Sequence, residues 1–175
     1  YQFLVDTMKE LEKHQGAIIG LSSIARFAGQ DIGQTLKAAA DLSADGLINM
    51  KDAATSLKNL LSRGFSLDEA ILLLNRFKDA AAFGRQSSLT LSEAVRSATE
   101  GIKNENSILV DNAGVTKNVS KMWEEYAKQL GVGVRSLTLV QRRQAELNGI
   151  LRETEGMVGN ADLALVTMTG TLSKY

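Results

Sequence analysis

The residues best suited to chemistry lie in the stretch from Asp41 to Asp52, which reads DLSADGLINMKD. Its oxygen-bearing side chains fall at the ligand positions of a twelve-residue calcium loop; they are Asp41, Ser43, Asp45, Asn49 and Asp52. Gly46 stands where such a loop turns sharply, and Ile48 takes its apolar position. The spacing therefore raises the hypothesis of a calcium-responsive helical module that binds other proteins.

The same stretch also has an ordinary structural interpretation as a helix–turn–helix. Asp-Gly is a common turn pair, and Asp52 is well suited to cap a following helix. Ser43 and Asn49 are weak calcium ligands, and the shorter Asp52 replaces the usual bidentate glutamate. We therefore assign no metal ligands and keep the calcium loop as the alternative.

The remaining residues do not assemble into a catalytic set. His14 is the one histidine, cysteine is absent, and no nucleophile elbow accompanies them. Glu124 and Glu125 are adjacent, so their carboxylates diverge around a helix. The glycines lack the Gly-Lys-Ser/Thr ending of a phosphate-binding loop. We expect neither an enzyme nor a cofactor.

Charge also bears on the class of partner. Lys plus Arg and Asp plus Glu both number 20, so the formal net charge is zero. Nucleic-acid binders usually carry a basic excess, which is missing here. Arg142-Arg143 is the densest basic spot, and we expect it on a solvated helix face. Trp123 and Tyr126 share one helix face, where core packing is favoured over a role as an interface hot spot.

Composition and periodicity favour helix throughout. The chain of 175 residues has no proline, and its 15 glycines fall between apolar-periodic stretches. Helices are predicted over 3–27, from Ile32 to near Asp41, after Asp52 to Gly64, and over 66–84, 90–102, 122–131, 138–155 and 160–172. Capping boxes mark three of these starts: Ser66 with Glu69, Thr90 with Glu93, and Thr138 with Gln141.

The helical period is lost between Asn104 and Val119. Within this stretch Ser107–Val110 looks locally extended, and Asp111–Gly114 is predicted to form a turn. The stretch is also the best candidate for a boundary between 1–103 and 120–175. The sequence as a whole predicts an all-α compact bundle of roughly seven to nine helices joined by glycine-rich turns.

Three long stretches taken in order resemble the tail tape measure proteins, or minor tail proteins, of bacteriophages and prophages. They are GFSLDEAILLLNRFKDAAAFG (64–84), LSEAVRSATEGIKNENSILVDNAGVTKNVSKMWEEYAKQLG (91–131) and LTLVQRRQAELNGILRETEGMVGNADLALVTMTG (137–170). The resemblance extends over residues 35 to 172 and weakens towards the start. It is carried by length rather than by a short signature.

This resemblance implies a structural role. The chain would be one segment of a long helical protein that sets tail length and helps tail assembly. Its partners would be copies of itself, tail-tube or tail-tip proteins and tail assembly chaperones, and no nucleic acid. It would be found in the virion tail, and in the bacterial cytoplasm during assembly. The apolar faces of the first and last helices are the predicted interfaces.

Overall fold

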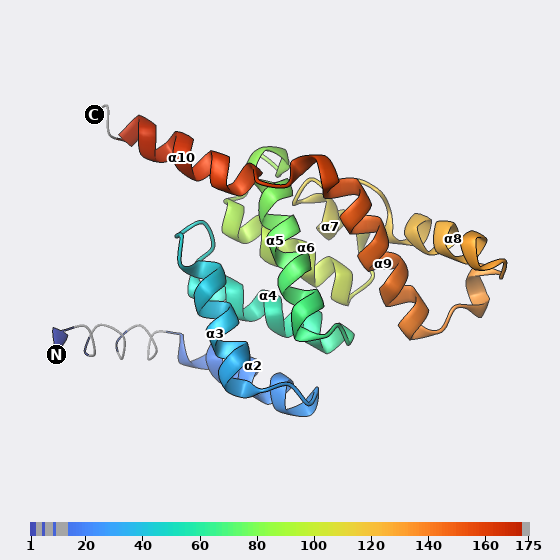
Figure 1. The fold of residues 1–175 in the computed structure, drawn as a ribbon, viewed down its shortest axis with the longest axis horizontal. Coiled ribbons are helices and arrows are strands. Elements are labelled where there is room, and N and C mark those ends of the chain that lie inside the picture. The colour runs from blue at the N-terminus through green and yellow to red at the C-terminus, as the bar shows by residue number, and fades with distance from the viewer. Residues whose placement is uncertain (3–4, 6–8, 10–13, 173–175) are drawn as a thin grey trace.

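The computed structural model describes residues 1, 2, 5, 9 and 14–172, with side chains described as far as residue 167. Its α-helices are α2 (Gln15–Phe27), α3 (Ile32–Ser43), α4 (Met50–Arg63), α5 (Leu67–Gly84), α6 (Leu91–Lys103), α7 (Ser107–Asp111), α8 (Val119–Leu130), α9 (Leu139–Thr154) and α10 (Asn160–Leu172). Short 3-10 turns, η1 (Val134–Ser136) and η2 (Glu155–Met157), precede and follow α9. The prediction of an all-α bundle is confirmed (Figure 1). The first half of the helix predicted over 3–27 lies largely outside the described residues.

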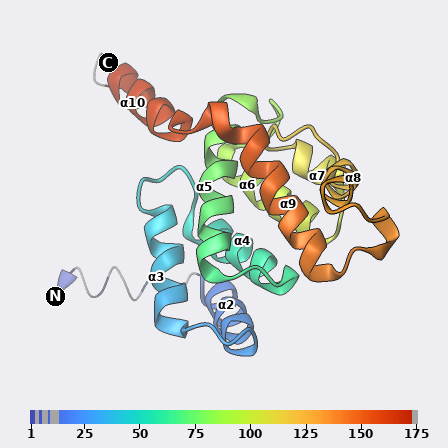
Figure 2. The same cartoon turned by 45° about the vertical axis from the view of Figure 1, so that its right-hand side comes forward.

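Helix α5 is the centre of the molecule. It packs against α3, α4, α6, α9 and α10, and Figures 1 and 2 show these helices around it. Leu73, Leu74 and Phe77 recur at helical spacing and are fully buried. An apolar stripe of this kind on a long helix provides the surface on which the other helices assemble.

The predicted helix boundaries are largely confirmed. In all three capping boxes the hydroxyl accepts from the third helical amide, and the Glu or Gln side chain accepts from the cap amide. Gly64 and Gly131 end α4 and α8 with φ of 106° and 72°. A left-handed residue at this position satisfies the last carbonyls of the helix, and glycine adopts it without steric cost.

The predicted start of α4 was wrong by three residues. Asn49, not Asp52, is the N-cap: its side chain accepts a hydrogen bond from the Asp52 amide at 2.8 Å. Asp52 lies in the first turn instead, and its carboxylate is directed at Ser92 and Arg96 of α6. Both residues are good caps, and the contact with α6 decides between them.

The stretch between α6 and α8 also differs from prediction. Ser107–Val110 is not extended but belongs to the short helix α7, while the turn that follows it at 112–114 was predicted correctly. Asn106 begins α7 by accepting from the Ile108 amide, and the fully buried Val110 packs against Gly101 of α6. A short apolar run is compatible with either structure, so packing determines which one forms.

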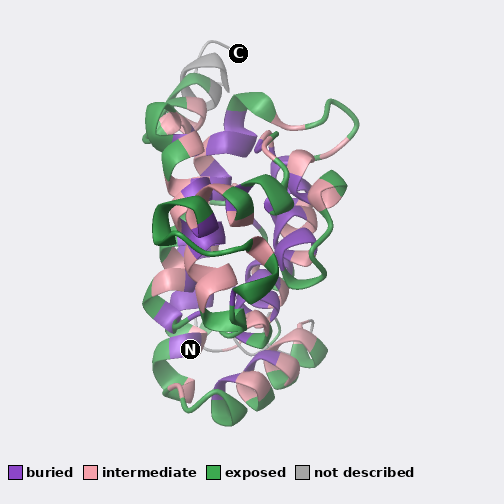
Figure 3. Ribbon diagram, turned by 90° about the vertical axis from the view of Figure 1, so that its right-hand side faces the viewer, coloured by how far each residue is buried: buried purple, intermediate pink, exposed green. Residues whose placement is uncertain are grey.

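One hydrophobic core crosses the boundary proposed near 104–119. The same cluster of buried side chains includes Leu21 of α2, Val110 of α7 and Ile150 of α9. Figure 3 shows buried residues along the interior between the helices. Glu153 of α9 also accepts hydrogen bonds from the amides of Thr116 and Lys117, which ties the end of this stretch to α9. Among the described helices, none has both the length and the apolar character needed to cross a membrane.

Candidate functional site

The carboxylates of the calcium-like loop each face a cationic side chain. Asp41 pairs with Lys37 at 2.8 Å on the surface of α3. Asp45 pairs with Lys78 of α5 at 2.9 Å. Lys78 is almost fully buried and also donates to the carbonyl of Leu42. Asp45 therefore fastens the loop to α5.

The last carboxylate of the loop points into the protein. Asp52 is 3% exposed and accepts from the Ser92 hydroxyl at 2.6 Å and from Arg96 at 3.0 Å. The Asn49 side-chain amide donates to it as well, while Ser43 donates to the carbonyl of Ala40. The oxygen atoms that would have to bind one calcium ion therefore form hydrogen bonds and ion pairs with separate partners.

The backbone of the loop does follow the predicted pattern. Gly46 turns the chain with φ of 82°, and Ile48 is fully buried. Within the described part of the chain, no three His, Cys, Asp or Glu side chains lie close enough to hold a metal ion. The turn and the apolar anchor therefore follow the motif, while the charged groups pair with lysine and arginine instead of converging.

The most deeply buried charge lies elsewhere, on α9. Glu146 is completely buried and receives two hydrogen bonds from Arg63 of α4, at 3.3 and 2.8 Å. The indole Nε1 of Trp123 on α8 donates a third at 2.8 Å. A two-pronged contact between guanidinium and carboxylate fixes orientation as well as distance. Together with Glu105 and Arg142, these residues form what we call the Glu146 cluster.

Burial controls the electrostatics of the Glu146 cluster. Loss of solvent raises the pKa of Glu146 above its usual value, although the hydrogen bonds from Arg63 and Trp123 and the charge of Arg63 oppose the shift. Burial acts to lower the pKa of Arg63, but hydrogen bonds to Glu146 and Glu105 and their charges outweigh it, so that pKa is raised. Arg63 thus keeps its charge in a buried position.

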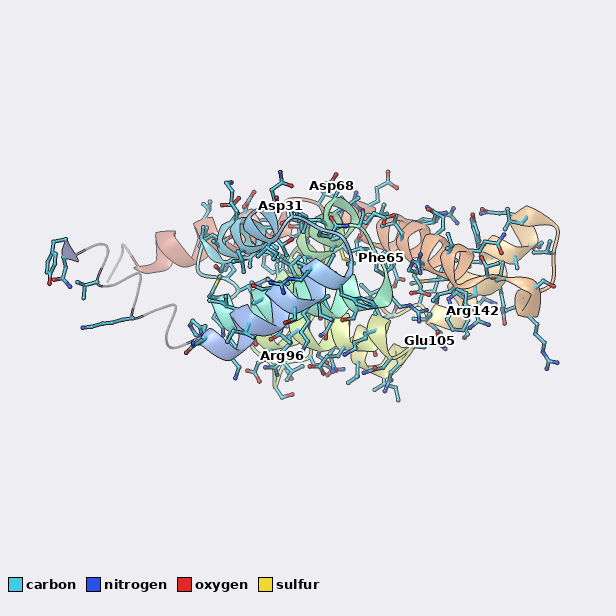
Figure 4. All side chains as sticks on the ribbon, turned by 90° about the horizontal axis from the view of Figure 1, so that it is seen from below. Asp31, Phe65, Asp68, Arg96, Glu105 and Arg142 are labelled. Carbon is cyan, nitrogen blue, oxygen red and sulfur yellow. The ribbon has the colours of Figure 1, made fainter. Side chains whose placement is uncertain are left out.

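Glu105 and Arg142 complete the cluster at its edge. Glu105 accepts from Arg63 at 2.8 Å and lies 3.9 Å from Arg142, and Figure 4 shows Glu105 and Arg142 close together. Glu105 adopts φ of 55°, a left-handed conformation that costs a non-glycine residue about 1–2 kcal/mol. Its carboxylate offsets this cost by balancing the charge of Arg63.

The helix face at Arg142-Arg143, which was predicted to be solvated, is only partly exposed. Arg142 lies 4.9 Å from the centre of the Trp123 ring, within range of a cation–π contact. Arg143 packs over Gly64, where an added Cβ would come within 2.7 Å of its guanidinium. Both arginines therefore help to join α9 to α4 and α8. The sequence pattern shows the two charges, but it does not show that the Trp123 ring and the backbone at Gly64 pack against them.

Sequence reasoning missed the Glu146 cluster, although one signal was present. Glu146 stands four residues before the buried Ile150, on the apolar face of α9. An acidic residue at such a position needs a buried partner. Trp123 was correctly expected to pack against the core, and Glu124 and Glu125 diverge as predicted, pairing with Lys121 and Lys117 respectively.

The surface carries large apolar side chains in several places. On α10, Leu163 and Val166 are more than half exposed. A second group surrounds the turn between α8 and α9: Leu130, Val132, Leu139 and Val140. Phe83 lies at the end of α5, and Ile19 and Phe27 lie on α2. Exposed apolar groups in contiguous patches mark protein-binding surfaces.

In the described part of the chain, the region around Phe27 combines an exposed apolar side chain with a hollow in the surface. A groove of about 470 Å³ lies between the end of α2 and the α4–α5 corner. Ile24, Leu61 and Phe65 give it apolar walls, Glu69 also lines it, and the largely exposed Phe27 stands on its rim. Figure 4 shows Phe65 beside the end of α2. The groove is large enough for an aromatic or aliphatic side chain from another molecule.

No protein-family model matches this chain. No solved structure matches it either.

Proposed function

We propose that this chain is a structural segment of a phage or prophage tail tape measure protein, acting through protein–protein contacts. The observation that carries the proposal is the sequence resemblance over residues 35 to 172. That range coincides with the helices from α3 to α10, which begin at Ile32 and end at Leu172. The resemblance therefore spans most of the packed helices, while α2, which packs on α4 in the same core, precedes it.

The compact fold refines the role that this segment would have in setting tail length. As one continuous helix, 175 residues would extend about 260 Å. Among the helices that the structure describes, α5 is the longest, with 18 residues, and the helices fold back on one another. A segment of this shape spans much less length per residue than a rod. We infer that it forms a folded module at an end of the tape measure or within it.

The resemblance implies the proposed partners, and the exposed apolar groups offer surfaces on which they would bind. They are further copies of the chain, tail-tube or tail-tip proteins and tail assembly chaperones, in the assembling tail and in the virion. The calcium-responsive module stays an untested alternative, and the pairing of Asp41, Asp45 and Asp52 with cations gives it no added support. We propose no catalytic role.

Particles purified from an induced lysate of the host test this proposal. Peptides of this chain should be found by mass spectrometry in tailed particles, and an in-frame deletion of residues 35–172 should abolish tails or change their length. A matched deletion in an unrelated prophage gene controls for loss of induction. Absence of the chain from the particles, or wild-type tails and titre in the deletion strain, would contradict the proposal.

A further inference from the structure

The groove beside Phe27 has an unusual neighbour. Phe27, at the end of α2, is 92% exposed, and it stands on the rim of a groove that it does not fill. A phenylalanine side chain can bury about 150–250 Å². The structure therefore places an unburied aromatic side chain next to a space that could bury one.

We propose that this groove is filled by Phe27 of a second copy of the chain, and that Phe27 of the first copy fills the groove of the second. A twofold interface uses the same patch on both molecules, so each residue on one side must find its complement within that patch. Phe27 and the groove lie side by side and meet this condition. The proposal specifies one partner of the proposed function, a second copy, and its surface.

The charges near the groove favour the same arrangement. Arg26, next to Phe27, is exposed and forms no ion pair within the described residues. Glu69 lines the groove, the exposed Asp68 precedes it in the first turn of α5, and neither forms an ion pair within that same part of the chain. When Phe27 enters the partner's groove, it brings a positive charge towards two negative ones.

The area available predicts a weak dimer. Two phenylalanine side chains and the groove walls that they cover account for roughly 600–1,000 Å² in total. This is below the ~1,200 Å² of a stable interface. The isolated chain should therefore be monomeric at micromolar concentration and should dimerise at about 0.1–1 mM. Within an assembly that holds copies together, the effective concentration is in the millimolar range and the contact would form.

Sedimentation velocity over this concentration range tests the proposal. The wild-type chain should shift from monomer to dimer, and Phe27→Ala should weaken dimerisation about a hundredfold, because each dimer loses two aromatic anchors. Phe83→Ala is the matched control, since Phe83 is 60% exposed at the other end of α5. It should dimerise as the wild type does. Ser62→Arg, at the exposed rim of the groove, should abolish the dimer while the unfolding midpoint stays unchanged.

Two results would overturn the proposal. One is a wild-type chain that stays monomeric at about 1 mM, and the other is a Phe27→Ala chain that dimerises like the wild type. A photoreactive phenylalanine analogue at position 27 locates the contact, and we expect crosslinks to Leu61, Ser62 or Phe65 of the second copy. Crosslinks from a monomeric chain to another protein in the particle would also overturn it. Those results leave the particle test unaffected, so the two proposals can fail separately.

Discussion

At the scale of single residues, Glu146 shows how charge is used inside this fold. Its carboxylate oxygens accept three hydrogen bonds, all from donors on other helices. Arg63 also donates a hydrogen bond to Glu105. The Glu146 cluster therefore joins α4, α8, α9 and the turn after α6. A buried ion pair is weak evidence for stability, but it does fix which surfaces can meet. In this protein it sets the position of α8 and α9 against α4.

The raised pKa of Glu146 predicts how stability depends on pH. The folded protein holds the Glu146 proton more tightly than the unfolded chain, so this group stabilises the fold most at low pH. Its contribution is lost as the pH rises from the usual value of 4.5 through the higher folded pKa. The difference in unfolding free energy between wild type and Glu146→Gln should therefore decrease as the pH is raised across this range, by about 1.4 kcal/mol per unit of pKa shift.

Urea unfolding of both chains at several pH values measures this difference. Glu124→Gln is the matched control, since Glu124 is an exposed acid on α8 and its substitution should leave the pH dependence unchanged. An increase of the wild-type advantage with rising pH would mean that the pKa of Glu146 is lowered, and would contradict the prediction.

At the scale of helices, close approaches at glycine determine how neighbouring elements pack. Gly101 of α6 lies where α7 begins, and a Cβ there would be 2.6 Å from the carbonyl oxygen of Asn106 and 2.7 Å from the amide of Val110. Gly149 of α9 faces Met122 of α8 at a similar distance. Glycine in the interior of a helix lowers the stability of that helix. At these two positions the loss is accompanied by a closer contact with the neighbouring helix.

Substitution at Gly101 should therefore destabilise the protein. Gly101→Ala gains up to about 1 kcal/mol of helix propensity, but its Cβ overlaps backbone atoms of α7, and the net loss should be about 1–3 kcal/mol. Gly20→Ala in α2 is the matched control, because its Cβ meets only the Lys58 side chain, at 3.6 Å. It should stabilise the protein by about 0.5–1 kcal/mol. Equal effects in urea unfolding of the two variants would refute the steric argument.

At the scale of the whole molecule, one continuous core unites the chain. The buried cluster includes residues before and after 104–119, and α5 contacts both α4 and α9. A single continuous core favours cooperative unfolding in one step. The stretch at 104–119, considered as a domain boundary from its irregular sequence, contributes the buried side chains Val110, Val115 and Val119 to that core.

Thermal unfolding should accordingly be a single transition. Trp123 is the one tryptophan and lies on α8, so its fluorescence reports on the packing around the C-terminal helices. Circular dichroism reports on all helices. The two signals should give the same midpoint when measured on one sample. A fluorescence transition several degrees away from the circular dichroism transition would show that 1–103 and 120–175 unfold separately.

The sequence alone determined the local structure of this protein. Hydroxyl-and-acid pairs such as Ser66 with Glu69 predict helix starts correctly, because a cap is satisfied within four residues. Glycines such as Gly64 predict helix ends for the same reason. Helical periodicity predicts the fold class, since an apolar stripe is a property of one helix. The signals that succeeded are those whose partners are close in the chain.

The tertiary structure decided the features that depend on residues far apart. From the sequence, Asp52 was interpreted as a helix cap or a calcium ligand. In the structure its carboxylate accepts hydrogen bonds from Ser92 and Arg96, which lie 40 and 44 positions later. Glu146 meets Arg63 across 83 positions, and α7 is helical because Val110 packs on Gly101. Each outcome depends on which surfaces come together when the chain folds. Which surfaces meet is decided by the packing of the whole chain, and it cannot be read from the local spacing of side chains.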